Sequence, residues 1–468
     1  MKIRFTFLTA FALLVLLTAS TTRIQHDNFT ANMVGLLLVL PDEPFNYDID
    51  FPDHVLFGPW SFVDSTSVNN SITPAGATLG RVLFYDKKLS KSNDLSCASC
   101  HRQEFAFADN KQFSDGINGA KTTRNSPNLN DIVWGGSLFT DPFGLENGLF
   151  WDNRENNLEV MVLQPIEHEG ELGKDLGYLI QKLEETEYYG PLFEDAFGTP
   201  TVTAERIGSA IAQFVRSMAS FNSKYDQVKM GQADFTSQEQ MGEHVFIESC
   251  GNFCHGEPHF GSSMPMNNGL DSLYSDEGVA TWTNSSHDVG KFRSPSLRNI
   301  AVTAPYMHDG RFETLEEVVE FYSSEVFPHP NNDFEWTIGE LNFTGFNFNE
   351  ESKAALVAFL KTLTDESFLT SEKWSDPFQE ANSATFLPLE EKVTIFPNPF
   401  NDKATVELDN PTGSTYTLRF TTVEGRVLKS YKTISNSLTI EKGDLSAGVY
   451  MLEISKENRK KVEKVVIQ

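Results

Sequence analysis

The feature that most constrains this chain is the pentapeptide Cys97-Ala98-Ser99-Cys100-His101. Two thiols three residues apart can form thioethers to both vinyl groups of a haem, and the histidine that follows supplies an imidazole ligand to its iron. A redox-active cysteine pair or half of a zinc site would use similar residues, but no second Cys-x-x-Cys completes a zinc ligand set. The pattern therefore predicts covalent attachment of a c-type haem by Cys97, Cys100 and His101.

The other two cysteines form a related motif with one more residue between the thiols, Cys250-Gly251-Asn252-Phe253-Cys254-His255. A disulfide between Cys250 and Cys254 would explain this segment alone about as well. Because a complete haem-attachment motif precedes it in the same chain, we interpret it as a second haem site. Two covalently bound c-type haems are therefore predicted, and the ligand on the far face of each iron would decide whether it reacts or only passes electrons.

The central part of the chain carries apolar residues at helical spacing, and several of these segments begin with Ser or Thr. The expected helices are 178–187, 204–220, 237–247, 315–322 and 350–363. We predict a mainly α fold with two cytochrome-c-like haem domains, at 53–225 and 226–375, followed by a small all-β sandwich. The chain has no Gly-rich phosphate loop, Gly-x-Ser-x-Gly or His-Glu-x-x-His motif, so nucleotide, serine-hydrolase and zinc-protease chemistry lack support.

The N-terminus has the pattern of a secretory signal peptide. Lys2 and Arg4 precede an apolar run at 5–17, and small residues follow it. We expect residues 1–22 to be removed; a retained anchor helix is the alternative. No other segment approaches the roughly 18 apolar residues that a spanning helix needs, so no transmembrane segment is predicted in the mature chain.

The last part of the chain changes to short β-rich runs separated by turns. We expect a linker at 376–391 and a β-sandwich at 392–468. The predicted strands are 404–408, 416–422, 425–431, 437–440, 448–454 and 462–467.

Charge is divided unevenly along the chain. Acidic residues outnumber basic ones 65 to 37, which gives a net charge of −28 and opposes a role in nucleic-acid binding. The segment 392–468 holds 12 basic and 9 acidic residues, so all the net negative charge lies in the preceding part. A basic partner would be attracted to that part.

Several separate motifs in the body resemble those of the bacterial di-haem cytochrome c peroxidase and MauG family. They are 79–86 (LGRVLFYD), 124–127 (RNSP), 150–154 (FWDNR), 294–300 (SPSLRNI) and 303–310 (TAPYMHDG). The resemblance extends from about residue 53 to residue 364. It implies an enzyme that reduces hydrogen peroxide with electrons relayed between two haems, the N-terminal haem being peroxidatic and the C-terminal haem an electron reservoir.

The resemblance also implies roles for individual residues. His101 and His255 would be the proximal iron ligands, Trp151 would connect the two haems, and Glu171 would be the distal acid that moves a proton during peroxide cleavage. A core aromatic and an exposed loop carboxylate are the alternatives for Trp151 and Glu171. The family's distal glutamine is replaced by Met161, and Gln164 is a nearby substitute.

Two positions separate subtypes within this family. Some members block the resting peroxidatic haem with a loop histidine, but residues 111–123 contain no histidine, so this haem is expected to be open. The sixth ligand of the C-terminal haem would be Tyr322, as in MauG, where the peroxidases have methionine. A phenolate ligand would favour ferric iron. Met264, Met266 or Met307 is the alternative ligand.

The resemblance implies one calcium ion as well, held by Asn125, Thr303 and Pro305 through oxygen atoms of the kind that suit a hard cation. Arg293 and Arg298 are candidates for pairing with haem propionates; solvent-exposed arginines are the alternative.

The C-terminal domain resembles the sorting domain of type IX secretion substrates. The segments 395–400 (IFPNPF), 424–427 (EGRV) and 445–450 (LSAGVY) carry this resemblance, together with a basic ending. It implies secretion machinery as a partner and export through the periplasm to the cell surface or the medium. A carbohydrate-binding or adhesive sandwich is the alternative.

The sequence therefore predicts an exported di-haem peroxidase with hydrogen peroxide and an unidentified electron donor or organic substrate as partners. A MauG-like oxidase of an amino-acid side chain or small organic substrate is the alternative within the family. A di-haem cytochrome that only transfers electrons is the alternative of another class.

Overall fold

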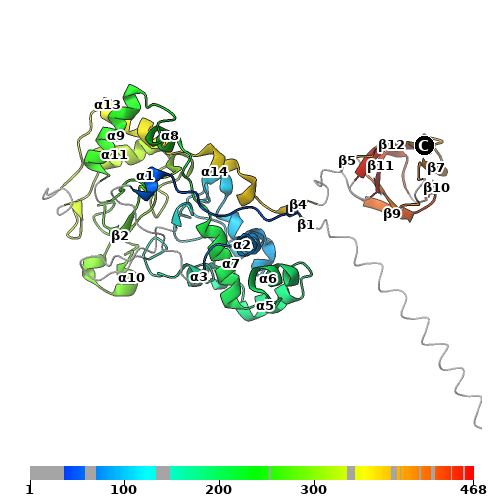
Figure 1. Cartoon of the computed structure of the whole chain (residues 1–468), viewed down its shortest axis with the longest axis horizontal. Coiled ribbons are helices and arrows are strands. Elements are labelled where there is room, and N and C mark those ends of the chain that lie inside the picture. The colour runs from blue at the N-terminus through cyan, green and yellow to red at the C-terminus, as the bar shows by residue number, and fades with distance from the viewer. Residues whose placement is uncertain are drawn as a thin grey trace, which may run out of the picture. The chain divides into compact units, whose positions relative to one another are not determined.

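The computed structural model describes residues 36–57, 70–132, 148–251, 254–334, 343–380, 387–389, 392–410, 413–422, 427–443, 445–456 and 459–468. The chain divides into a large unit, Leu38–Phe378, and a unit that contains Gln379–Gln468. We call the first the body and the second the C-terminal domain (Figure 1). The expected signal peptide lies outside the described residues.

The body consists of short helices joined by long turns. Its first half contains α1 (Asp53–Leu56), α2 (Pro74–Tyr85), α3 (Leu158–Met161), α4 (Gln164–Glu167), α5 (Leu176–Glu184), α6 (Tyr189–Phe197) and α7 (Ala204–Arg216). Its second half contains α8 (Lys224–Lys229), α9 (Ser237–Ser249), β2 (Ser262–Met266), α10 (Ala280–Thr283), β3 (Phe292–Ser294), α11 (Leu315–Ser324), α13 (Glu350–Lys361) and α14 (Glu366–Thr370). The short β1 (Leu36–Leu38) pairs with β4 (Phe378–Glu380).

Local capping fixes where the principal helices begin. Thr73 accepts a hydrogen bond from the backbone of Gly76 at the start of α2, and Asn349 caps α13 in the same way. Thr236 and Glu239 form a capping box at the start of α9. These side chains satisfy backbone N–H groups that otherwise have no partner in the first turn.

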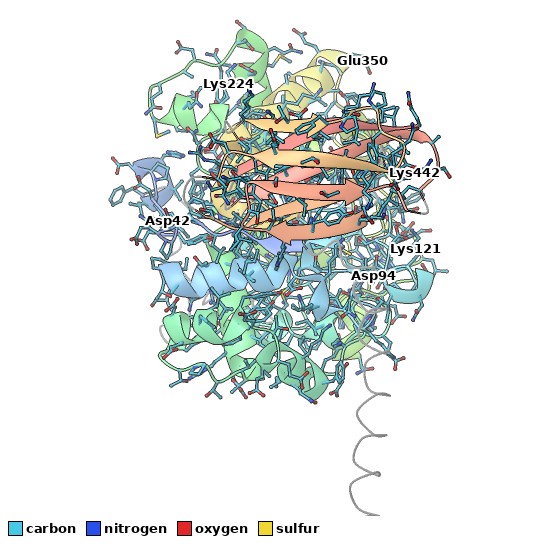
Figure 2. All side chains as sticks on the ribbon, turned by 90° about the vertical axis from the view of Figure 1, so that its right-hand side faces the viewer. Asp42, Asp94, Lys121, Lys224, Glu350 and Lys442 are labelled. Atoms are coloured by element: carbon cyan, nitrogen blue, oxygen red, sulfur yellow. The ribbon has the colours of Figure 1, made fainter. Side chains whose placement is uncertain are left out.

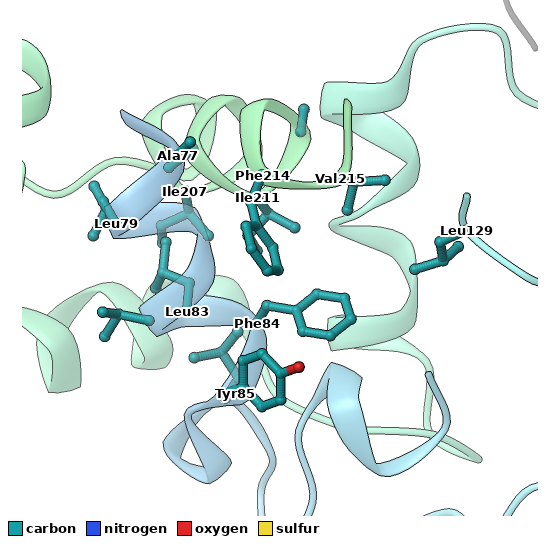
Figure 3. Close-up of a cluster of buried hydrophobic side chains, with 14 of the residues drawn as sticks. Ala77, Leu79, Leu83, Phe84, Tyr85, Leu129, Ile207, Ile211, Phe214 and Val215 are labelled. Atoms are coloured by element: carbon teal, nitrogen blue, oxygen red, sulfur yellow. The ribbon is translucent and has the colours of Figure 1, made fainter. Parts of the chain in front are cut away.

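Each half of the body is built on one pair of crossing helices. In the first half, α2 packs on α7, and Figure 3 shows Leu83 and Phe84 of α2 facing Ile211 and Phe214 of α7. In the second half, α9 packs on α13. Both crossings use a glycine: a Cβ on Gly80 would lie 2.0 Å from Ala210 O, and a Cβ on Gly242 would lie 2.0 Å from Ala355 O. Any larger residue would force the helices apart.

Three phenylalanines repeat around these crossings. Phe84 lies 5.4 Å from Phe214 and 5.9 Å from Phe107 between ring centroids. The equivalent ring Phe246 lies 5.2 Å from Phe359 and 5.6 Å from Phe260. The two halves therefore share one packing pattern, although they bury different sets of neighbouring residues.

A buried arginine of the second half helps to join the halves. Arg298 is fully buried and forms two hydrogen bonds with Asp226, each of 2.9 Å. It also donates to the carbonyl oxygens of Pro258 and Ser220. Its positive charge holds the pKa of Asp226 well below its usual range, despite burial. Arg298 is therefore neither a surface arginine nor free to pair with a propionate.

The C-terminal domain is a β-sandwich, as predicted. One sheet has the order β10-β7-β6 and the other β5-β12-β11-β8-β9, with all pairs antiparallel except β5 and β12. Val406, Leu418 and Leu452 lie in the core between them. The strands are β5 (Leu387–Pro388), β6 (Val393–Phe396), β7 (Lys403–Leu408), β8 (Tyr416–Thr421), β9 (Val427–Thr433), β10 (Ser437–Glu441), β11 (Gly448–Lys456) and β12 (Arg459–Ile467).

The expected helices and strands agree with these bounds to within a few residues at most ends, but the sequence-based prediction lacked α1–α4, α6, α8, α10, α14 and β1–β6. Charged side chains cover the outside; Figure 2 labels the exposed Asp94, Lys121 and Glu350. Within the part of the chain that the structure describes, no helix has the length and apolar character needed to cross a membrane.

Candidate functional site

Each cysteine–histidine motif of the body opens onto a cavity. Cys97, Cys100 and His101 line the first, which we call the N-terminal cavity. Cys250, Cys254 and His255 line a larger second one, which we call the C-terminal cavity. Cys97 begins a short turn, Cys97–Ser99, and Cys100 follows it directly. Cys250 directly follows the end of α9, and Cys254 comes four residues later. The motifs therefore place two thiols and an imidazole at the wall of each cavity.

The two histidines are oriented in the same way. His101 Nδ1 donates to the carbonyl oxygen of Phe107 over 2.8 Å, and His255 Nδ1 donates to that of Phe260 over 2.9 Å. Both phenylalanines have positive φ, 61° and 55°, which turns their carbonyls toward the rings. Burial lowers the pKa of both histidines. Each histidine ring is therefore neutral and fixed in orientation, and its Nε2 is available to bind a metal ion.

All four cysteines are free thiols, so the disulfide alternative for Cys250 and Cys254 is not adopted in this structure. Burial raises the pKa of Cys97 and Cys254 to about 12 and that of Cys100 and Cys250 to about 11. A redox-active thiol needs the opposite shift. Among the residues with described positions, no three His, Cys, Asp or Glu side chains gather as a metal cluster.

The remaining walls of the N-terminal cavity are mainly apolar, with Glu171 and Asp115 as their acidic groups. They include Leu129, Leu158, Met161, Val162 and Leu172. Burial raises the pKa of Glu171, while His168 and Arg154 act in the opposite direction. A raised pKa favours the protonated carboxyl group, which is the form that can donate a proton.

Gln164 does not reach this cavity. Its Nε2 donates to Glu155 Oε2 over 3.0 Å, and it is absent from the residues that line the cavity wall. Met161 does line the wall, so the position expected for a glutamine presents a thioether there. The suggestion that Gln164 substitutes for it is therefore wrong.

Trp151 lies where the two halves meet. Its Nε1 donates to Asn125 O of the first half over 2.8 Å, and its carbonyl accepts from Arg293 N of the second half over 2.8 Å. Its ring meets the ring of His308 edge-on, with 6.5 Å between centroids. Trp151 also lines the C-terminal cavity.

The C-terminal cavity has a different set of polar groups. Tyr322 lines it, and Asn268 Nδ2 donates to the tyrosine hydroxyl over 3.0 Å. Burial raises the pKa of Tyr322. Met266 and Met307 line the same cavity, and Met266 Sδ lies 3.3 Å from Cys254 Sγ. Met264 is not among the lining residues.

Arg293 is the unusual cation of this cavity. Burial lowers its pKa to about 10, and its Nε is buried with no hydrogen-bond partner. It lines the cavity beside His255. A buried guanidinium without a partner is costly in free energy, and an anionic group in the cavity would remove that cost.

Asn125, Thr303 and Pro305, the predicted calcium ligands, all line the C-terminal cavity. The Asn125 side chain donates to the carbonyls of Lys111 and Gln112 over 3.1 and 3.4 Å, which leaves its own oxygen as an acceptor. The sequence predicts these three residues as calcium ligands only through the family resemblance. It gave no indication of His168 or of the unpaired Nε of Arg293.

Comparison with known proteins identifies both parts. The model of the family "Di-haem cytochrome c peroxidase" matches residues 74–234, and that of the family "Secretion system C-terminal sorting domain" matches residues 394–468. A cytochrome c551 peroxidase of Nitrosomonas europaea is 30% identical over 63% of this chain and 83% of its own length. A methylamine utilization protein MauG of Methylophilus methylotrophus is 29% identical over 63% and 84%.

Solved structures agree with these matches. A MauG-like protein associated with microbial copper homeostasis superimposes with a TM-score of 0.58 and 34% identity, over 67% of this chain and 96% of that one. The di-haem peroxidase BthA of Burkholderia thailandensis shares the fold, with a TM-score of 0.54, 24% identity and 68% and 93% coverage. The two cavities with their cysteine–histidine walls, together with these matches, show that the chain belongs to the di-haem cytochrome c peroxidase family, which includes MauG.

Proposed function

We propose that this protein is an exported peroxidase that reduces hydrogen peroxide with electrons relayed between two covalently bound c-type haems. The observation that carries this proposal is the repeated wall of each cavity: two buried thiols and a neutral imidazole whose Nδ1 is fixed by a backbone carbonyl. When bound there, the haem irons supply the redox chemistry. The protein's own residues supply attachment, orientation and proton transfer.

Cys97, Cys100 and His101 would hold the peroxidatic haem, and Cys250, Cys254 and His255 the reservoir haem. The cavities fit such groups because their walls are mainly apolar and Arg293 offers an unpaired cation for a propionate. The same set of residues fits no zinc site, as shown above, so haem remains the cofactor that explains both motifs.

Glu171 would act as the distal acid of the N-terminal cavity. Cleavage of the peroxide O–O bond requires a proton to move from one oxygen to the other. Two carboxyl groups of described residues line that wall, and Asp115 is already paired with Lys111 and Lys121, which leaves Glu171 for this role. The raised pKa of Glu171 favours its protonated form, and this form can give its proton to a peroxide oxygen.

Trp151 would connect the halves electronically. It donates a hydrogen bond to the first half, accepts one from the second and lines the C-terminal cavity. A tryptophan fixed in this way offers a π-system along the route between the two sites. A core aromatic with no electronic role would not need contacts to both halves.

The finer assignments in the C-terminal cavity are part of the proposal. Tyr322 would be the sixth ligand of the reservoir iron, with its hydroxyl positioned by Asn268. Asn125, Thr303 and Pro305 would bind calcium through oxygen atoms. The body would comprise haem domains at 53–225 and 226–375, and the C-terminal domain would direct the chain through the periplasm to the cell surface or the medium.

The second candidate function is a MauG-like oxidase of an amino-acid side chain or a small organic substrate. Tyr322 favours it, because a phenolate ligand lowers the potential of a haem iron and disfavours electron uptake from an ordinary cytochrome. If Tyr322 is the ligand, Tyr322→Phe should convert the C-terminal haem to high spin. A spectrum identical to that of the wild type would contradict the ligand assignment.

The test of the function is the stoichiometry of peroxide reduction by the purified exported protein. With a reduced one-electron donor, each peroxide consumed should oxidise two donor molecules, and omission of the donor should abolish continued turnover. Loss of peroxide without donor oxidation would contradict a peroxidase, and no reaction with peroxide would establish a cytochrome that only transfers electrons.

A further inference from the structure

The loop that carries Glu171 presents a second titratable group to this acid. His168 Nδ1 lies 3.4 Å from Glu171 Oε1. The His168 side chain is 62% exposed and the Glu171 side chain 35% exposed. Because Glu171 also lines the N-terminal cavity, the carboxyl group stands between the cavity and an imidazole in contact with water.

The backbone holds this pair in place. The carbonyl of His168 accepts hydrogen bonds from the N–H groups of Glu171 and Gly173, each of 3.0 Å, and His168 N donates to Gln164 O over 3.0 Å. The carbonyl of Glu171 accepts from Ile117 N over 3.0 Å. The spacing of the two side chains therefore follows from a folded loop rather than from free surface rotation.

The absence of a side chain at Gly170 leaves room for the His168 ring. A Cβ at Gly170 would lie 3.2 Å from Cε1 and 3.4 Å from Nδ1 of His168. The other charges around the pair are few. Arg154 acts on Glu171 but is itself bonded to Asp152 over 2.8 Å, and Glu167 and Glu169 are exposed on the same loop.

Peroxide reduction needs protons from solvent. Hydrogen peroxide takes up two electrons and two protons to give two water molecules, while two molecules of a one-electron donor are each oxidised. The N-terminal cavity offers apolar side chains on most of its wall, and these cannot carry protons. A proton must therefore enter the cavity through one of its polar groups, and Glu171 is one that also contacts an exposed imidazole.

We propose that His168 passes protons between solvent and Glu171 during peroxide reduction. This inference rests on the proposed function. Glu171 gives its proton to an oxygen of the peroxide, and the Nδ1–H of His168 then protonates the carboxylate. His168 Nε2 takes a proton from solvent in the same exchange, so the ring stays neutral with its proton on Nε2. Proton exchange of the exposed ring with water then returns the proton to Nδ1 before the next turnover.

The first test is His168→Gln, assayed for peroxide reduction at saturating donor with haem content measured for each preparation. The expected result is a fall in kcat of at least about 10-fold, because a positioned proton-transfer group typically contributes about 10²–10⁴-fold. A hindered imidazole buffer, whose ring methyl group weakens binding to iron, should restore part of the rate. Unchanged kcat would overturn the relay.

His244→Gln is the matched control. His244 Nε2 lies 3.4 Å from Glu248 Oε1 and the histidine side chain is 71% exposed, so it offers a second exposed imidazole–carboxylate contact. Neither residue lines a cavity given above. This variant should keep the wild-type kcat and show no response to the buffer; a fall equal to that of His168→Gln would overturn the relay.

His168→Lys separates proton transfer from simple electrostatics. Lysine keeps a positive charge near Glu171 but does not release its proton readily at neutral pH, because its ordinary pKa is about 10.4. The relay predicts that this variant is as slow as His168→Gln. A wild-type rate would mean that His168 acts only through its charge, and would overturn the relay.

Glu171→Gln distinguishes failure of the relay from failure of the function. If Glu171→Gln is inactive and His168→Gln is fully active, only the relay is wrong. If Glu171→Gln keeps the full rate of peroxide reduction, both the distal acid of the proposed function and the relay to it are wrong.

Discussion

The two halves of the body share one set of helix, phenylalanine and histidine contacts, which we call the frame, but different residues line their cavities. In each half a glycine lets one helix approach another to within contact of its backbone, three phenylalanines pack at the crossing, and a histidine donates its Nδ1 hydrogen to a phenylalanine carbonyl. None of these shared features would react with peroxide. They account for how a haem can be held and oriented.

The cavities themselves are unlike. The N-terminal cavity has a mainly apolar wall that also contains Glu171 and Asp115. The C-terminal cavity has Tyr322 bonded to Asn268, and the unpaired Arg293. The chemistry of each half therefore depends on a few side chains that line its cavity, since the helix crossing and the histidine contact are equivalent in the two halves.

The largest expected effect is loss of one haem. Replacing Cys97 and Cys100 together by serine should leave the protein with one covalent haem, and replacing Cys250 and Cys254 should do the same, because a serine hydroxyl cannot form the thioether. Mass spectrometry of the intact exported protein measures this. If the second pair of substitutions left the mass of the attached groups unchanged, the one-residue-longer motif would not be a haem site.

The next effect concerns the distal chemistry of the N-terminal cavity. Glu171→Gln removes the carboxyl proton while keeping the size of the side chain, and should lower kcat for peroxide reduction by about 10²–10⁴-fold. Both haems should remain attached. Glu167→Gln, at an exposed acid of the same loop, is the control; equal activities of the two variants would remove the proposed role of Glu171.

The smallest effect concerns the shared frame. Phe214 and Phe359 are fully buried and each packs against the equivalent phenylalanine of its own half. Phe214→Ala and Phe359→Ala should each lower the free energy of unfolding by about 3–5 kcal/mol, because each removes a large buried side chain and leaves a cavity. Denaturant unfolding followed by circular dichroism measures both. A large loss for one variant and none for the other would show that the halves are not equivalent.

The sequence predicted what depends on near neighbours in the chain. The cysteine–histidine motifs and the helix over Leu315–Ser324 could be found because the residues that matter are a few positions apart, and Thr314 with Glu317 marks the helix start. The alternating strands of the C-terminal sandwich were found for the same reason.

What it did not predict depends on residues far apart. Arg298 was considered for a propionate or the surface, yet it pairs with Asp226, 72 positions away. Gln164 was suggested for the cavity, yet it bonds to Glu155. The pairing of His168 with Glu171 could have been noticed from their spacing, but only the folded loop shows that this acid faces the cavity while the imidazole faces water.

The most direct test of the central claim is the absorption and paramagnetic resonance spectrum of the resting ferric protein. If the shared frame supplies one histidine in each half and only the C-terminal cavity supplies a second ligand, the spectrum should show one high-spin and one low-spin haem in equal amounts. Two low-spin haems of six ligands each would contradict the claim, because both halves would then be closed to peroxide.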